Sequence, residues 1–290
     1  STMLGRENPY LQDSNSSART TRSIAVFLDV LGFSGRIVQA YKDNSDSTLL
    51  RDLRSALTSA GEAFAAPYPS FTEDRMIGFT QIKQADFWHI KSFTDNIVIG
   101  CPISTDNADG EAELGGLIVS LRWYQLEMVR RGFFVRGGIA VGELYMDEDI
   151  VFGDALLEAY KIESKIARDP RIVLSPKVEP LIERHLEFYA ETAESPHIHT
   201  LLRDSDEQLF VNYLGAALDE NPEDPDFHAM EAHQESVVSM LNNHKADPAI
   251  WAKYAWVANY HNFICDEQGS QLERYKIDPS LLRLVPRRMT

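Results

Sequence analysis

The stretch IAVFLDVLGFS, residues 24–34, decides how the rest of this chain is understood. Residues 24–31 form a nearly continuous apolar run that ends at Gly32, as expected of a strand buried on both faces. One acidic residue, Asp29, interrupts the run. Because burying an isolated carboxylate is costly, such a group usually shifts its pKa, pairs with a cation or binds a metal. The position of Asp29 therefore predicts chemistry at this end of the strand.

A second aspartate stands in a similar setting, in HIKSFTDNIVIG (residues 89–100). Residues 75–92 and 95–101 are predicted to be two strands that meet at Thr94, Asp95 and Asn96, and the last two of these favour tight turns. Asp95 would then lie at the tip of a hairpin. Two carboxylates on neighbouring strands predict a site for divalent cations.

The periodicity of apolar residues predicts an α+β fold. The remaining elements expected around these strands are a helix over 47–65, a helix from Leu114 to Gly132, a strand over 133–142, a hairpin over 143–152, a helix over 153–167, a strand over 171–174 and a helix over 176–185. This order is the ferredoxin-like βαββαβ pattern, for which we expect an antiparallel sheet with helices over one face.

Composition divides the chain into three parts. Residues 1–22 are polar and rich in turn formers, which predicts a flexible N-terminal arm. Residues 23–186 hold the predicted βαββαβ domain. Residues 187–290 are predicted to form a mixed, largely helical C-terminal appendage, with a hairpin (197–203 and 208–214), an acidic loop (219–226) and helices over 227–244 and 249–266.

Charge and cysteine content restrict the partners of this 290-residue chain, of which 44% is hydrophobic. A formal net charge of −16 opposes general attraction to nucleic acid or anionic lipid, because phosphate binding needs a positive field. No apolar run approaches the roughly 18 residues of a membrane span. Only Cys101 and Cys265 occur, so neither a disulfide framework nor a zinc cluster is supported, and we expect a soluble protein of the cytoplasm.

Four segments together resemble one enzyme family. FLDVLGFS resembles the F-x-D-[IV]-x-G-F-[ST] motif of class III nucleotidyl cyclases. KSFTD (91–95) is similar to their K-x-x-G-D motif with Thr94 in place of Gly, VRGGIAVG (135–142) is similar to R-x-G-I-x-x-G, and GDALLEAYKIES (153–164) is similar to G-x-x-V-N-x-A-x-R-L-x-x. The resemblance covers roughly residues 24–186, and the order and spacing of the motifs agree jointly.

This resemblance implies a role for individual residues. Asp29 and Asp95 would ligate two Mg²⁺ or Mn²⁺ ions, with the Val30 carbonyl as a further ligand. The Phe33 and Ser34 backbone and Arg136 would hold the phosphates of a nucleoside triphosphate. Lys161 stands at the position of the transition-state arginine, and Lys91 at that of a base-reading lysine. In this family the sites are shared across a head-to-tail homodimer, so Asp29, Asp95 and Arg136 of one subunit would face Lys91 and Lys161 of the other.

Departures from the family pattern restrict which nucleotide is expected as substrate. Leu157 replaces the ribose-orienting Asn, and Ile150 stands where a residue usually helps to select a purine. An apolar residue cannot read a base edge by hydrogen bonding, so a pyrimidine is favoured. The chain is therefore similar to the pyrimidine cyclases of bacterial Pycsar antiphage systems, whose cyclic UMP or cyclic CMP activates a separate effector protein. We expect a uridylate cyclase that converts UTP to 3′,5′-cyclic UMP and pyrophosphate.

Other interpretations remain open from the sequence. Cytidylate cyclase is the nearest alternative. A cyclase-like module that binds nucleotide with little turnover is suggested by Leu157 and Lys161, and other palm-like nucleotidyltransferases share the paired aspartates. His197 and His199 are expected to share a face of a strand, but no third ligand accompanies them, so zinc is not expected there. Hydrolases are disfavoured because no G-x-S-x-G elbow, Walker loop or H-E-x-x-H stretch is present.

Overall fold

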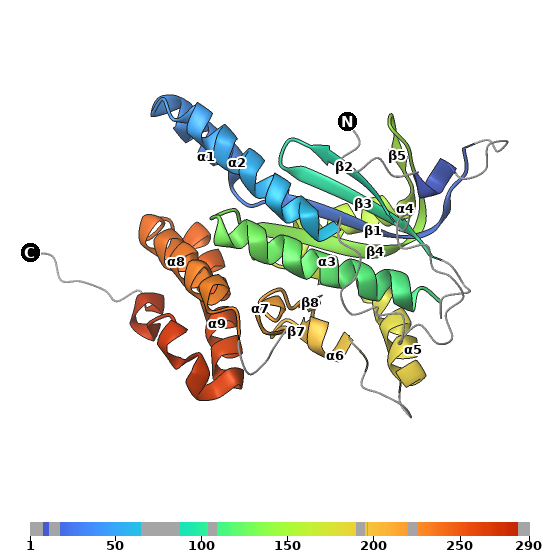
Figure 1. The fold of residues 1–290 in the computed structure, drawn as a ribbon. Helices are drawn as coiled ribbons and strands as arrows, with labels where there is room; N and C mark the ends of the chain where they lie inside the picture. The colour runs from blue at the N-terminus through green and yellow to red at the C-terminus, as the bar shows by residue number, and fades with distance from the viewer. Residues whose placement is uncertain are drawn as a thin grey trace, which may run out of the picture.

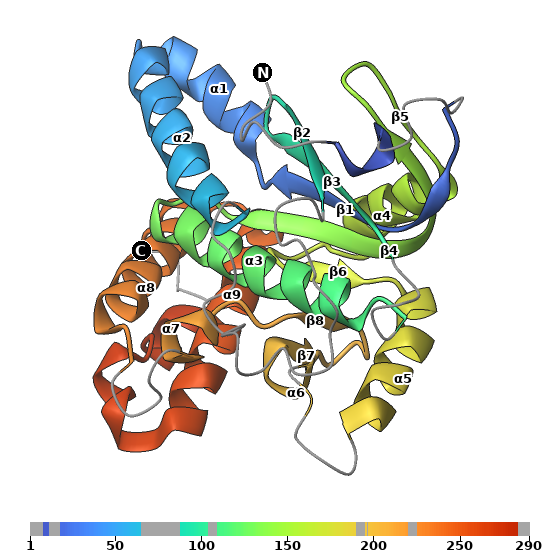
Figure 2. The same cartoon turned by 45° about the vertical axis from the view of Figure 1, so that its right-hand side comes forward.

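The computed structural model describes residues 8–11, 18–64, 88–103, 109–189, 195, 197–219 and 225–283. Its centre is one mixed sheet with the strand order β2-β3-β1-β4-β6-β8-β7, and β5 pairs with β4 outside this path (Figures 1 and 2). The strands are β1 (Thr21–Val30), β2 (His89–Phe93), β3 (Asn96–Pro102), β4 (Val135–Met146), β5 (Val151–Phe152), β6 (Ile172–Leu174), β7 (Leu201–Arg203) and β8 (Leu209–Val211). The helices are α1 (Phe33–Lys42), α2 (Asp46–Gly61), α3 (Glu111–Arg130), α4 (Asp154–Lys165), α5 (Glu179–Tyr189), α6 (His197–Thr200), α7 (Ala216–Asp219), α8 (Phe227–Asn243) and α9 (Pro248–Gln268).

The predicted α+β class is confirmed. Strand β1 is antiparallel to both β3 and β4, and β2 is antiparallel to β3. The sheet is mixed because β4 and β6 run parallel. The β1–β4 register sets Asp29 opposite Arg136, and the β1–β3 register sets Leu28 opposite Ile97, just beyond the β2–β3 turn. These two registers bring the ends of three strands together.

The expectation of helices over one face is wrong, because α4 covers the other face. Successive residues of β1 point to opposite sides of the sheet. Val26 and Leu28 pack in the core that includes Leu117 of α3, whereas Ala25 packs with Ala155 and Ala159 of α4. Asp29 follows the parity of Ala25 and therefore lies on the α4 side.

Glycines allow α4 to lie close to β4. A Cβ atom added to Gly138 would lie 2.2 Å from the Ala159 carbonyl oxygen and 2.8 Å from the Ile162 Cβ. A side chain at Gly138 would therefore hold the helix away from the sheet. The glycines of VRGGIAVG are thus explained by packing.

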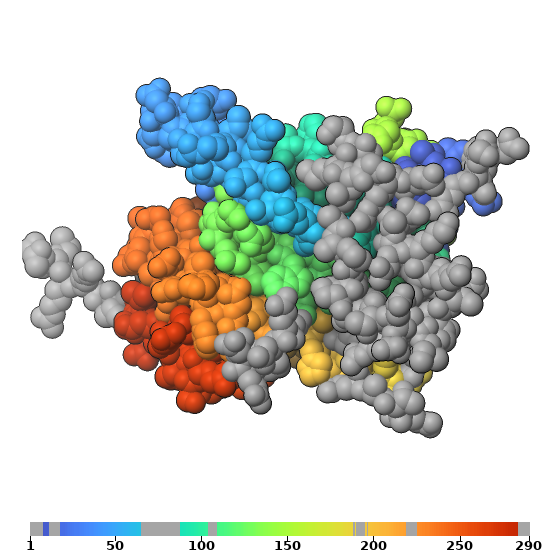
Figure 3. All heavy atoms as spheres, in the orientation of Figure 1, coloured from blue at the N-terminus to red at the C-terminus, as the bar shows by residue number. Residues whose placement is uncertain are grey.

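Several helices follow the predicted periodicity, whereas α1 and the short helices α6 and α7 were not predicted. Helices α2, α3, α4, α8 and α9 begin and end within a few residues of the expected bounds. Helix α1, directly after Gly32, was expected only as a turn into the next element. Figure 3 shows α1 and α2, in blue, projecting from the rest of the molecule. Of the strand expected over 75–92, residues 75–87 lie outside the described residues.

The hairpin of the C-terminal part extends the central sheet. Val173 of β6 pairs with Phe210 of β8, and β8 pairs with β7. Leu31 and Phe134 share a hydrophobic core with residues of α8 and α9, including Met230 and Tyr254. The described residues of β7, β8, α8 and α9 therefore share a sheet and a hydrophobic core with the preceding elements. The expected strand over 197–203 begins only at Leu201, because residues 197–200 form α6, so His197 is buried while His199 is exposed.

Part of the expected flexible arm packs against the sheet. The Tyr10 hydroxyl donates to Ser23 Oγ at 3.0 Å, and Asn8 Nδ2 donates to the Met146 carbonyl at 2.8 Å. Strand β1 also begins at Thr21, two residues earlier than the expected domain boundary. In the described segments, no helix is long and apolar enough to cross a membrane.

Candidate functional site

Charged side chains meet at the shared end of β1 and β4, on the α4 side of the sheet. Arg136 Nε donates to Asp29 Oδ2 at 3.0 Å, and Arg136 Nη2 lies 3.0 Å from the same oxygen. The other side of this guanidinium meets Glu163 of α4, whose Oε1 is 2.8 Å from Nη2. The Asp29 side chain is 18% exposed and that of Glu163 only 4%. Arg136 therefore bridges two carboxylates at the edge of the interior.

The second predicted aspartate lies at the β2–β3 turn. Thr94 Oγ1 lies 2.6 Å from the Phe93 carbonyl oxygen and 2.8 Å from Asp95 Oδ1, and the Asn96 amide is 3.4 Å from the same Asp95 oxygen. Thr94 has a φ of 56°, in the left-handed region that glycine adopts most easily. The turn retains that conformation with a threonine.

Asp29 and Asp95 interact electrostatically. Burial raises the pKa of Asp29 above its ordinary value, Arg136 opposes this rise, and the negative charge of Asp95 adds to it. Burial likewise raises the pKa of Glu163, again against the effect of Arg136. A nearby cation that offsets this repulsion would favour the ionised form of the aspartates.

The donor set at this strand end fits a divalent cation. All hydrogen bonds to Asp29 use Oδ2 and all those to Asp95 use Oδ1, so within the described chain each carboxylate keeps one oxygen without a hydrogen-bond partner. Carboxylate oxygens are the ligands that Mg²⁺ and Mn²⁺ prefer. Val30, whose carbonyl was expected as a further ligand, is the last residue of β1. No group of three His, Cys, Asp or Glu side chains suited to a metal occurs among the described residues, so substrate oxygens would have to complete the coordination.

The N-terminus of α1 provides backbone donors after the same strand. The first backbone hydrogen bond of this helix runs from the Arg36 N–H to the Gly32 carbonyl at 3.2 Å, and no side chain caps the helix. The N–H groups of Phe33 and Ser34 precede this bond. Uncapped N–H groups at a helix N-terminus favour anions such as phosphate. Phe33 is buried and fixes this turn in the core, while Ser34 is exposed.

The two predicted lysines lie elsewhere on the same protomer. Lys91 of β2 donates to the Glu148 carbonyl in the β4–β5 hairpin at 3.0 Å. Lys161 is exposed on α4, near Glu158. No hydrogen bond or ion pair joins either lysine to Asp29 or Asp95 in the described part of the chain. The structure thus brings together Asp29, Asp95, Arg136 and the start of α1, but not Lys91 or Lys161.

One charged residue of this cluster was not singled out from the sequence. Glu163 lies in the quoted segment GDALLEAYKIES, where Ala155, Ala159 and Ile162 form the buried face of α4. An acidic residue beside the apolar face of an amphipathic helix indicates a buried charge that needs a partner. That signal would have identified Glu163, although not its partner Arg136.

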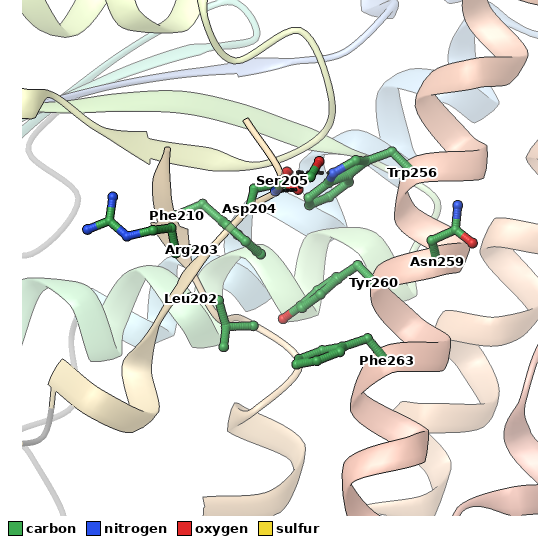
Figure 4. Close-up of a pocket in the computed structure, with 9 residues that line it drawn as sticks. All are labelled: Leu202, Arg203, Asp204, Ser205, Phe210, Trp256, Asn259, Tyr260 and Phe263. Carbon is green, nitrogen blue, oxygen red and sulfur yellow. Dashed lines mark hydrogen bonds between the residues drawn. The ribbon is translucent and has the colours of Figure 1, made fainter. Parts of the chain in front are cut away.

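A cavity of about 310 Å³ lies between α9 and the β7–β8 hairpin (Figure 4). Trp256, Tyr260 and Phe263 extend from one side of α9 toward Phe210. The Asp204 side chain lines this cavity. Its carboxylate already accepts a hydrogen bond from Trp256 Nε1 at 2.7 Å and pairs with Arg171. The cavity therefore offers aromatic walls but no free acidic group. The rings of Trp256 and Tyr260 stack on each other, with centroids 5.6 Å apart.

Comparison with known proteins gives no family. No protein-family model matches the chain, and no curated protein sequence matches it.

Proposed function

We propose that the chain is a metal-dependent nucleotidyl cyclase that converts UTP to 3′,5′-cyclic UMP and pyrophosphate. The observation that carries this proposal is the pair Asp29 and Asp95: the charge of Asp95 adds to the effect of burial in raising the pKa of Asp29, and each carboxylate has one oxygen to which no described residue donates. The order of the flanking motifs, which resembles that of class III cyclases, supports the same assignment. We assign the βαββαβ part of the sheet to the cyclase fold on these grounds.

The reaction is an in-line displacement within one nucleotide. The ribose 3′ oxygen forms a bond to the α-phosphorus, the bond from that phosphorus to the β-phosphate bridging oxygen breaks, and the 3′ hydroxyl proton leaves to solvent. Bound Mg²⁺ or Mn²⁺ would lower the pKa of the 3′ hydroxyl and neutralise triphosphate charge. Asp29, Asp95 and the Val30 carbonyl would hold two such ions.

The protein's own residues supply binding and charge stabilisation. Arg136 carries a planar guanidinium suited to phosphate oxygens, and the Phe33 and Ser34 N–H groups are uncapped. Lys161 would stabilise charge on the transferred phosphoryl group, and Lys91 would contact the base. In this scheme the chain acts mainly by positioning and electrostatics.

A homodimer would bring the lysines to the site. By the family pattern, Lys91 and Lys161 of one subunit complete the site of the other. Exposed apolar side chains near Lys161 suit such an interface: Leu157 is 69% exposed and Tyr160 is 53% exposed. The cyclic nucleotide would then signal to a separate effector protein in antiphage defence in the cytoplasm.

The direct test is incubation with each nucleoside triphosphate and Mn²⁺, followed by mass analysis of the products. We expect cyclic UMP from UTP, and loss of at least about a hundredfold in rate for Asp29→Asn and Asp95→Asn. Asp52→Asn, on the exposed surface of α2, is the matched control and should keep parental turnover. A folded protein that forms no cyclic mononucleotide from any triphosphate would contradict the proposal.

The same assay separates the alternatives. Cyclic CMP as the main product identifies a cytidylate cyclase. Tight triphosphate binding without pyrophosphate release identifies a regulatory module, and a dinucleotide or longer product identifies another palm-like nucleotidyltransferase.

Shared sites have their own test. Asp29→Asn and Lys161→Met chains should each be inactive alone. Co-expressed, they should recover about one quarter of parental activity, because half of the dimers are mixed and each of these has one intact site. No recovery in verified mixed dimers would mean that each subunit carries a complete site.

A further inference from the structure

Helix α9 reaches the end of the sheet that carries the candidate active site. The ring of Tyr254 on this helix packs edge-on against Phe134, with centroids 4.9 Å apart. The Phe134 carbonyl in turn accepts from the N–H of Leu31, two residues after Asp29, at 2.7 Å. Figures 1 and 2 both show α9 on the side of the molecule from which α1 and α2 project. The C-terminal part of the chain therefore borders the strand end where Asp29 and Arg136 meet.

A second contact places α9 at the start of β6. Trp256 Nε1 donates to Asp204 at 2.7 Å, and Asp204 pairs with Arg171. Arg171 directly precedes β6, and its carbonyl accepts at 3.1 Å from the N–H of Gly137, the residue after Arg136. One turn of α9 is thus fixed to the starts of both β4 and β6, which are neighbours in the sheet.

Lys253 lies between these two contacts on the helix surface. Successive residues of a helix are about 100° apart, so Lys253 lies about 100° from Tyr254 on one side and about 60° from Trp256 on the other. Val257, one turn further along on the side of Lys253, is fully buried, whereas Lys253 is partly exposed. The lysine therefore stands at the edge of the buried face of α9, with its long stem against the protein and its amine toward solvent at the sheet end.

The charge of Lys253 acts on the acidic groups of this strand end. Burial raises the pKa of Asp29 and of Asp169, and the charge of Lys253, after that of a neighbouring arginine, lowers both values. Lys253 forms no ion pair with another residue of the described chain. A cation that lies near two carboxylates and pairs with neither is available to an incoming anion.

A triphosphate at this strand end requires positive charge that the neighbouring residues do not supply. Arg136 already pairs with two carboxylates, and Lys91 and Lys161 lie elsewhere on the protomer. A lysine amine binds phosphate as a compact point charge with three N–H donors. Lys253, whose charge reaches Asp29, provides such a group from the same protomer.

We propose that Lys253 binds the outer phosphates of the nucleoside triphosphate, so that helix α9 is a functional part of the site. This inference rests on the proposed function and deepens it, because it assigns a substrate contact to the C-terminal part of the chain. Lys253 and the uncapped N–H groups at the start of α1 act on the same triphosphate. A nucleoside monophosphate lacks the β- and γ-phosphates and does not make the contact with Lys253.

Binding of a nucleotide that cannot cyclise tests this contact without turnover. The probe is 3′-deoxy-UTP, or the 3′-deoxy analogue of whichever triphosphate the parent binds best, and the corresponding monophosphate is its comparison. With Mn²⁺ and full-length protein in equilibrium dialysis, Lys253→Met should weaken the triphosphate about tenfold and leave the monophosphate within about twofold. Lys253→Arg, which keeps the charge, should lose no more than about threefold.

Lys245→Met is the matched control, since it removes the same charge at an exposed position after α8 and should change neither constant. Circular dichroism checks the fold of each variant, and Lys253→Gln replaces Lys253→Met in the same comparison if the methionine variant does not fold. Equal weakening of both nucleotides at Lys253, or equal effects at Lys253 and Lys245, would overturn this inference and leave the cyclase proposal standing. A parent that binds none of the four nucleoside triphosphates would overturn both.

Discussion

Asp29 of β1 and Arg136 of β4 face each other in the antiparallel register, and their side chains form an ion pair at 3.0 Å. The same guanidinium holds Glu163 of α4. One arginine thus joins two strands and a helix at the candidate active site. Its removal would leave the partly buried Asp29 and the buried Glu163 without their cation.

Arg136→Met should therefore destabilise the protein by about 2 kcal/mol at pH 7, less than for a fully buried pair because the Asp29 and Arg136 side chains remain partly exposed. Arg136 lowers the pKa of both Asp29 and Glu163, so its loss raises both values further. A carboxyl group whose pKa is raised by folding destabilises the protein where it is ionised, and this penalty is relieved as the pH falls.

Urea unfolding at pH 7 and pH 5 measures the destabilisation caused by Arg136→Met. Arg54→Met, on the exposed side of α2, is the control. The difference in unfolding free energy between parent and Arg136→Met should shrink at pH 5. A difference that stays constant would show that packing of the arginine, and not its charge, accounts for the loss.

At Thr94 we expect glycine to be more stable than alanine, the reverse of the usual order in extended backbone. With a φ of 56°, Thr94→Gly should be about 1 kcal/mol more stable than Thr94→Ala, since only the alanine keeps a Cβ in the left-handed region. Both variants lose the hydroxyl that contacts the Phe93 carbonyl and Asp95 Oδ1, so that effect cancels in the comparison.

Ser92, exposed in strand β2, is the matched control for this comparison. There alanine should be more stable than glycine by roughly 0.5–1 kcal/mol, the usual order in extended backbone. Thermal unfolding of the four variants measures both differences, and the same sign at the two positions would refute the strain at Thr94.

Close packing of α4 makes Gly138 intolerant of any side chain. Gly138→Ala should cost about 3 kcal/mol, because the new Cβ would meet the backbone of Ala159, which cannot rotate away. Gly35→Ala in α1 is the control, since its Cβ would meet nothing within 4 Å and should stabilise the helix by about 1 kcal/mol. Urea midpoints compare the two, and a loss at Gly138 no larger than about 0.5 kcal/mol would contradict the contact.

A buried chain of hydrogen bonds predicts acid sensitivity. The Tyr213 hydroxyl is 2.8 Å from His233 Nε2, the two Nδ1 atoms of His233 and His261 are 2.9 Å apart, and His261 Nε2 is 2.8 Å from the Tyr275 carbonyl. Since that carbonyl accepts only, His261 donates through Nε2 and accepts through Nδ1 from His233. A proton on His261 Nδ1 would set two N–H groups against each other.

Burial lowers the pKa of His261 from its ordinary 6.5 to about 4. Its contribution to stability is therefore complete above pH 6.5 and is lost as the pH falls toward 4, by about 3 kcal/mol. His261→Gln can keep both hydrogen bonds without titrating, so the unfolding free energy of this variant should fall less steeply with pH. His228→Gln, at an exposed position of α8, should keep the parental slope, and a parental slope in His261→Gln would refute this account.

The candidate site shows how far the sequence alone could lead. Asp29 and Asp95 were identified because a charge in an apolar strand and a charge at a hairpin tip each stand out locally. Their mutual approach depends on the β1–β3 register, and the pairing of Arg136 with Asp29 depends on the β1–β4 register. Those registers are set by contacts between segments far apart in the chain, which local pattern does not report.

The fold divides in the same way. The local distribution of apolar residues determined helices α3, α8 and α9 and the two central strands, because a buried element carries more apolar residues than the turns that bound it. Only the tertiary structure decided that α4 covers the opposite face, that β7 and β8 extend the sheet through Val173 and Phe210, and that His197 lies in a helical turn. Each of these features depends on which distant surface is available to bury an apolar side chain. The free energy of that burial arises from the contact between two surfaces, so neither segment specifies it alone.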